Sequence, residues 1–164
     1  SYKENLQHGK WESWSENGAR LFSGTFYRGK REGSFSTWSE SGRLRNVGRY
    51  QNDLLDGDQE VWHENGALGS RCRYLAGKKN GSCDRWDDNG KPLARAEYHN
   101  DKPHGRWSSW HPNGVKSFEG QFFEGEKDGE FLTFRPDGRL EEKQIWRRGA
   151  LVPLDEGLAP EGSL

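Results

Sequence analysis

The sequence predicts an all-β fold: a single-domain antiparallel β-meander, built as a solenoid of six hairpin repeats, whose open sheet twists or curls. The first observation is a set of glycines spaced 24 residues apart: Gly9, Gly33, Gly57, Gly81, Gly105 and Gly129. The second is another set with the same spacing: Gly18, Gly42, Gly66, Gly90, Gly114 and Gly138. The third is the length of this period, because two strands of about six residues and two tight turns fill it and leave no room for a helix.

Two aromatic columns follow the same period. One is Trp14, Trp38, Trp62, Trp86, Trp110 and Phe134. The other is Phe26, Tyr50, Tyr74, Tyr98, Phe122 and Trp146. Aliphatic residues are scarce, so aromatic side chains must supply most of the buried area. We expect the first column to be core, because its regularity is typical of a structural position.

The second glycine set marks hairpin turns. In "HPNGV" the proline and asparagine suit a type I turn, and the glycine suits the left-handed position of a G1 bulge. This register places Trp38 opposite Leu44, Trp62 opposite Leu68 and Phe134 opposite Leu140. Segments such as "QNDLLDG" and "LAGKKNG" then close the other hairpin of each period.

The repeats predict one domain over residues 1–150, followed by a different segment at 151–164. Pro153 stands where the next repeat glycine is due. Because proline cannot donate to a strand ladder, we expect residues 151–164 to cap the last strand. The chain begins without methionine. Two explanations stay open: a boundary chosen within a longer protein, or removal of a signal or lipoprotein segment, which would imply a lipid anchor before processing.

Charge and hydropathy exclude two classes of partner. The 25 basic and 26 acidic residues are spread along the chain, so no sustained positive field is present for nucleic acid. No run approaches the roughly 20 apolar residues of a membrane helix, so we expect no integral membrane segment.

The repeat unit has a glycine, an aromatic two residues later, a tryptophan, Asn-Gly, a second aromatic and a Gly-Lys turn. It resembles the MORN-repeat variant of the YwqK-type antitoxin family over residues 2 to about 150. The resemblance implies stacked hairpins without catalysis of their own. It also implies an antitoxin or immunity role, including protection against lipase effectors of type VI secretion. Gln59 and Cys83 depart from the pattern by replacing the first aromatic of their repeats. Arg45 and Gly69 depart from it at a different position, where other repeats have bulkier residues.

Cys72 and Cys83 are predicted to face each other, because folding "CRYLAGKKNGSC" as a hairpin around Gly77 and Lys78 brings them together. Other hairpins carry a small and a large residue there, such as Ala96 with Trp107. A disulfide and two reduced cysteines both remain open. A disulfide indicates an oxidising compartment.

No catalytic, cofactor or metal site is expected. His63 and His111 share one repeat position two units apart, roughly 19 Å along the sheet, which is too far for one metal ion. The sequence contains no C-x-x-C, H-E-x-x-H or G-x-S-x-G motif.

Partner-binding residues are expected among three groups: aromatics on the pleat opposite the first column, departures from the repeat, and a central acidic cluster. They are Trp11, Phe35, Gln59, His63, Glu64, Asp84, Arg85, Asp87, Asp88, Trp107, His111 and Phe131. Exposed aromatics are typical interface anchors. The acidic cluster is either a steering surface or a solvated face, with Asp84–Arg95 and Glu60–Arg71 as ion pairs across hairpins.

The first functional hypothesis is a non-enzymatic immunity or antitoxin protein that occludes a cognate toxin or secreted effector. The alternative is a MORN-type scaffold that binds lipid headgroups or organises other proteins. The even mixture of charges favours the first, because a headgroup reader needs a basic face. The periplasm is the expected location if the disulfide forms, and the cytoplasm is the alternative.

Overall fold

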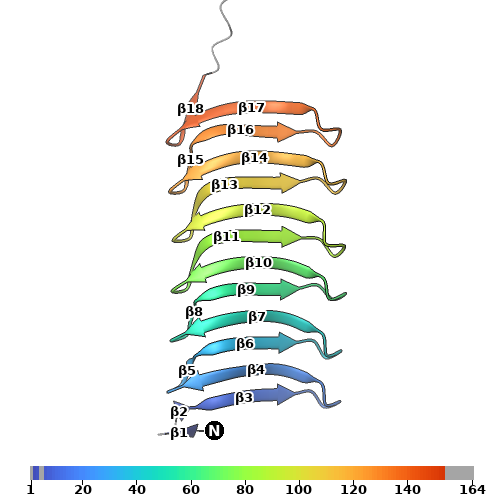
Figure 1. The fold of residues 1–164 in the computed structure, drawn as a ribbon, viewed down its shortest axis with the longest axis vertical. Coiled ribbons are helices and arrows are strands. Elements are labelled where there is room, and N and C mark those ends of the chain that lie inside the picture. Colours follow the sequence, from blue (N-terminus) through green and yellow to red (C-terminus); the bar gives the residue numbers. More distant parts are fainter. Residues whose placement is uncertain (1, 4–5, 154–164) are drawn as a thin grey trace, which may run out of the picture.

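The computed structural model describes residues 2–3 and 6–153. Within these residues one open antiparallel sheet follows chain order, and the predicted all-β meander is confirmed (Figure 1). Its long strands are β3 (Gly9–Trp14), β4 (Arg20–Tyr27), β6 (Gly33–Trp38), β7 (Leu44–Gln51), β9 (Gly57–Trp62), β10 (Leu68–Leu75), β11 (Lys78–Trp86), β12 (Pro92–His99), β13 (Lys102–Trp110), β14 (Lys116–Phe123), β16 (Gly129–Phe134) and β17 (Leu140–Arg147).

Short strands lie beside the long ones. Three of them extend the hairpins of β4, β7 and β14: β5 (Lys30–Arg31), β8 (Leu54–Leu55) and β15 (Glu126–Lys127). β1 (Tyr2–Lys3) and β2 (Leu6–Gln7) form a separate two-stranded sheet. β18 (Ala150–Val152) pairs with β17 at the end of the large sheet. The predicted capping segment otherwise lies mostly outside the described residues, since residues 154–164 are not described.

The turns of the second glycine set have the predicted geometry. In the first of them the Ser15 N–H donates to the Ala19 carbonyl at 2.8 Å, and Gly18 has a φ of 81°. The register shifts beside the aromatic residue, as a bulge requires. The predicted pairs Trp38–Leu44, Trp62–Leu68 and Phe134–Leu140 are all confirmed.

The other turns stack on one another along the opposite side of the sheet (Figure 1). Each is a two-residue loop with positive φ at both positions, such as Ala76–Gly77 and Asn100–Asp101, which is the type I′ geometry. The second loop residue donates its N–H to a carbonyl in the preceding turn, as Gly77 does to Leu55 at 2.7 Å. Neighbouring repeats are thus joined by backbone bonds beyond the ladder itself.

One face of the sheet carries a row of aromatic rings that pack edge to face. Phe35 lies 5.3 Å from Phe26 and 5.1 Å from Tyr50 between ring centroids. Phe131 lies 5.2 Å from Phe122. Glycines stand opposite the rings on neighbouring strands and leave room for them. An added Cβ at Gly120 would lie only 2.6 Å from the Phe131 ring.

The aromatic row corrects the sequence expectation about the core. Phe35 and Phe131 were expected as exposed anchors, yet they are 8% and 4% exposed and are the buried hydrophobic residues of the described chain. In the column expected as core, Trp14 on the terminal strand β3 is 54% exposed and the other five members are half-buried. The reason is the pleat: the Phe35 column shares its face with the Phe26 column, so each repeat contributes two rings to one row. The Trp14 column lies past the bulge, next to the turn.

The opposite face carries cross-strand ion pairs. Both predicted pairs are present: Arg71 Nη2 lies 2.6 Å from the Glu60 carboxylate, and Arg95 Nε lies 2.5 Å from that of Asp84. Further along, Lys143 pairs with Glu130. Basic side chains on this face therefore alternate with acidic ones.

The glycine–aromatic contact predicts that Gly120→Ala lowers the free energy of unfolding by about 1–3 kcal/mol, because the new methyl group must displace the Phe131 ring. Urea unfolding of the purified protein measures this. In the double variant Gly120→Ala/Phe131→Leu, the smaller leucine leaves space for the new methyl group. The loss of unfolding free energy in the double variant should therefore be less than the sum of the losses in the two single variants. Strict additivity would contradict the proposed packing.

Candidate functional site

The aromatic face is interrupted at the middle of the sheet. Towards the N-terminal end the row runs through Trp11, Phe26, Phe35 and Tyr50. Towards the C-terminal end it runs through Tyr98, Trp107, Phe122, Phe131 and Trp146. Between these two stretches Gln59 and Cys83 replace the rings of one column, and Cys72 lies opposite both. Tyr74 alone continues the Phe26 column there, half-buried between Tyr50 and Tyr98. The gap contains the two departures from the aromatic pattern.

A hollow of about 600 Å³ opens beside this gap. Small side chains line it, Cys83, Ala94 and Ala96 among them, and so do four basic residues, Lys79, Arg85, Arg95 and Lys127. Its aromatic lining comprises Tyr98, Trp107, Phe118, Phe122 and Phe131. Trp107 is only half-buried there. Among the predicted partner-binding aromatics, Trp107 therefore lies at an accessible surface, and Trp11 is also half-buried. Phe35 and Phe131 are buried within the aromatic row.

The predicted acidic cluster does not form one surface. Asp84 pairs with Arg95 on the ion-paired face, while its neighbour Arg85 points to the opposite side by the pleat. Asp87 accepts the N–H groups of Asn89 and Lys91 at 2.9 and 2.8 Å, within its own turn.

The two remaining acidic residues of the predicted set lie at exposed turns. Glu64 pairs with Arg45 at 2.7 Å, and the Asp88 carboxylate accepts the Asn89 amide at 3.0 Å. Asp87, Asp88 and Glu64 thus take part in forming or linking turns.

His63 and His111 connect repeats through backbone carbonyl groups. His63 Nε2 donates to the Trp86 carbonyl at 2.9 Å, and His111 Nε2 donates to the Phe134 carbonyl at 2.7 Å. Gly69, one of the departures from the repeat, makes room for the first ring: an added Cβ there would lie 2.9 Å from His63 Nε2. Sequence reasoning missed this compensation, although His63 and Gly69 depart from the pattern in the same repeat.

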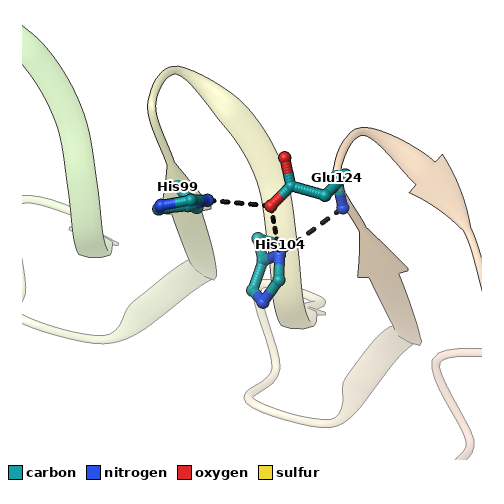
Figure 2. Close-up of side chains that lie close together, drawn as sticks. All are labelled: His99, His104 and Glu124. Atoms are coloured by element: carbon teal, nitrogen blue, oxygen red, sulfur yellow. Dashed lines mark hydrogen bonds and ion pairs between the residues drawn. The ribbon is translucent and has the colours of Figure 1, made fainter.

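A cluster that sequence reasoning missed lies at the stacked turns (Figure 2). His99 Nδ1 and His104 Nδ1 lie 2.8 and 3.3 Å from the same oxygen of Glu124. The hydrogen bond from His99 lowers the pKa of Glu124 below its ordinary value. No local motif reveals this cluster, because its residues come from two turns. His99 and His104 lie on either side of one type I′ turn, and Glu124 lies in the next turn of this type.

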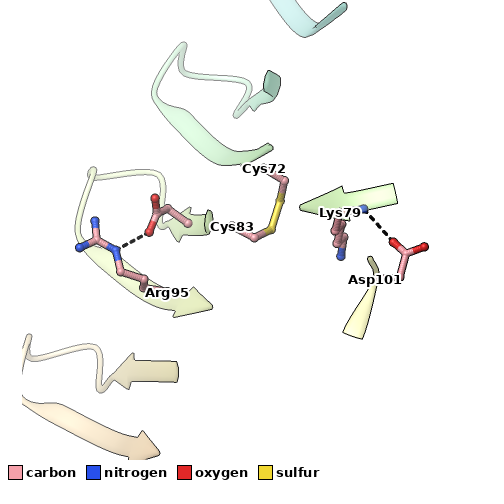
Figure 3. The surroundings of a disulfide bond; sticks show 6 residues. Cys72, Lys79, Cys83, Arg95 and Asp101 are labelled. Carbon is pink, nitrogen blue, oxygen red and sulfur yellow. Dashed lines mark hydrogen bonds and ion pairs between the residues drawn. A yellow bond between two sulfur atoms is a disulfide. The ribbon is translucent and has the colours of Figure 1, made fainter. Parts of the chain in front are cut away.

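The two cysteines lie directly opposite each other on β10 and β11, which is the predicted pairing. Their Sγ atoms are joined in a disulfide bond (Figure 3). The bond occupies the row positions at which neighbouring repeats place a small residue and a ring. It therefore spans the gap in the aromatic row with a covalent link.

Comparison with known proteins identifies one repeat directly. The segment 103–123, which contains most of β13 and all of β14, matches the family model described as MORN repeat variant. Residues 103–123 are a MORN repeat variant. No curated protein matches the chain. The other hairpins of the described sheet follow the same 24-residue register as this segment.

The presence of a MORN repeat suggests a repeat scaffold, an architecture that can bind lipids or proteins. Its surfaces rather than an enclosed pocket are available to a partner, since the described sheet is a single layer. The described residues include no helix long and apolar enough to cross a membrane.

The His63–Gly69 contact predicts that Gly69→Leu lowers the free energy of unfolding by about 1–3 kcal/mol, by displacing the ring and leaving the Trp86 carbonyl unpaired. Thermal and urea unfolding measure this. The double variant His63→Ser/Gly69→Leu reproduces the Ser15 and Leu21 combination of the first repeat and should recover most of the loss. A double variant no more stable than Gly69→Leu would contradict the contact.

The disulfide predicts that reduction lowers the free energy of unfolding by up to about 3 kcal/mol, because the cross-link restricts the unfolded chain. The variant Cys72→Ala/Cys83→Trp copies the Ala96–Trp107 pair, and its stability should not respond to reductant. A thiol assay on unreduced wild-type protein should find no free thiol; two free thiols would show that the bond is absent.

Proposed function

We propose that the protein is a non-enzymatic immunity or antitoxin protein that binds a cognate bacterial toxin or secreted effector and occludes it. Effectors of type VI secretion, lipases included, are the first class to test. The single observation that carries the proposal is the hollow of about 600 Å³ on the aromatic face, which is lined by small residues and aromatic rings together with basic side chains. Such a site suits an apolar side chain of a protein partner.

The distribution of charge supports a protein partner over a lipid surface. Several basic side chains opposite the aromatic face are paired with carboxylates, as in Arg71–Glu60 and Arg95–Asp84. On the aromatic face, Lys79 and Lys127 line the hollow and lie over the rings of Tyr98 and Trp146. A surface that reads anionic headgroups gains its affinity from unpaired Lys and Arg. The aromatic rings, by contrast, offer apolar contact area at low conformational cost.

The disulfide supports a location in the periplasm, because disulfides persist in oxidising compartments and thiols of cytoplasmic proteins are kept reduced. A periplasmic immunity protein would meet an effector after its delivery into the cell envelope. Occlusion by a sheet surface needs no chemistry from the immunity protein itself, so we propose no catalytic role for any residue.

The hollow predicts that Ala94→Phe weakens effector binding at least about tenfold, equivalent to about 1.4 kcal/mol, because the new ring fills the space. Phe22 and Phe118 occupy the equivalent position in other repeats, so the substitution suits the fold. The measurement is calorimetric titration with the effector encoded beside this gene, together with growth protection on co-expression.

The matched control is Ser36→Leu on the ion-paired face, which copies Leu132 of the last repeat and should leave affinity unchanged. An Ala94→Phe protein that binds and protects like the wild type would contradict the proposed interface. Failure to bind the effector, together with flotation on vesicles containing anionic lipid, would replace the proposal with a lipid-binding scaffold.

A further inference from the structure

The His99–His104–Glu124 cluster lies at two consecutive stacked turns. His99 ends β12 and His104 lies near the start of β13, so both flank the Asn100–Asp101 loop. Glu124 belongs to the next loop, between β14 and β15. The three side chains point toward one another from these turns (Figure 2). One ligand atom from each lies within 4.8 Å of the other two.

We propose that His99, His104 and Glu124 bind a divalent transition-metal ion, with Zn²⁺ as the probe, and that the ion clips two neighbouring turns together. Two imidazoles and one carboxylate are a ligand set that such ions prefer. Three protein ligands leave at least one coordination position open to water.

The distances in two of the three ligand pairs are close to those of a zinc site, and the third pair, the two histidine nitrogens, lies within 4.8 Å. Two ligands of a tetrahedral zinc ion, each about 2.0–2.1 Å from it, lie about 3.3 Å apart. The distance from His104 Nδ1 to Glu124 Oε1 is already 3.3 Å, and that from His99 Nδ1 is 2.8 Å. The second pair must therefore separate by a few tenths of an ångström. The hydrogen bond from His99 Nδ1 gives way to two metal bonds, and its proton passes to His99 Nε2 or is released to solvent.

The state of the His104 ring favours metal binding. The Glu124 backbone N–H donates to His104 Nδ1 at 3.4 Å, a contact made by the tautomer that carries its proton on Nε2. In this tautomer Nδ1 presents the lone pair that a metal ligand needs. Lys102 is the competing cation, with its Nζ 3.9 Å from Glu124 Oε2. The lysine side chain is 60% exposed and can turn to solvent when an ion replaces it.

The fold does not require this combination of residues. In other repeats a carboxylate stands at the position of His104 and accepts the same backbone N–H. Glu32, Asp56 and Asp128 do this. The position of His99 holds Gln51 or Leu75, and that of Glu124 holds Asn52 or Ala76. A turn can therefore be closed without any of the three, and their coincidence in one place points to a ligand.

These comparisons supply substitutions that keep the turns intact. His99→Gln copies Gln51, and Glu124→Asn copies Asn52. His111→Ser is the control, since it removes a histidine outside the cluster and copies Ser15 and Ser39. Far-UV circular dichroism checks that each variant retains the sheet.

The experiment is competition for Zn²⁺ against a chromophoric chelator, with the full chain free of any affinity tag and its disulfide intact. The wild type should bind one ion per chain. His99→Gln and Glu124→Asn should each weaken binding at least about tenfold, because even loss of a supporting residue around a metal commonly costs that much. His111→Ser should bind like the wild type.

Absence of Zn²⁺ binding by the folded wild type would overturn the proposal, as would unchanged affinity in His99→Gln and Glu124→Asn. The test is independent of any effector, so its outcome does not bear on the proposed immunity function.

Discussion

The sheet depends on one contact, that between an aromatic ring and the glycine opposite it on the next strand. Among the described residues no helix and no further layer of strands covers the face of the large sheet, so its core must form on the surface of the sheet itself. Phe35 and Phe131 become buried because rings from the Phe26 column pack edge to face against them. The glycine allows this, since a methyl group at Gly120 would overlap the Phe131 ring.

The same contact explains why the middle of the sheet differs from its ends. Where Gln59 and Cys83 replace the rings, the row loses its packing, and the Cys72–Cys83 disulfide supplies a covalent link instead. The loss leaves the hollow beside Ala94 and Ala96, walled by the rings that resume at Tyr98 and Trp107. Stability and the candidate binding surface thus arise from one interruption: the residues that weaken the row also open it to a partner.

Much of this was predictable from the sequence because the period is strict. Trp38–Leu44 and Asp84–Arg95 follow from counting residues away from a turn whose glycine reveals its geometry. The buried column was not predictable in the same way. Trp14 and Phe35 are both regular and aromatic, and only the bulge beside the turn and the packing of two columns on one face distinguish them. The contacts of His63 and Glu124 depend on how successive turns are staggered, which no local pattern encodes.

The most direct test of the central claim is the structure of the protein bound to the effector that the proposed function requires. The account predicts an apolar side chain of the effector seated in the hollow, in contact with Trp107 and Ala94. A complex in which the effector covers only the ion-paired face or the turns, with the hollow open to solvent, would contradict it.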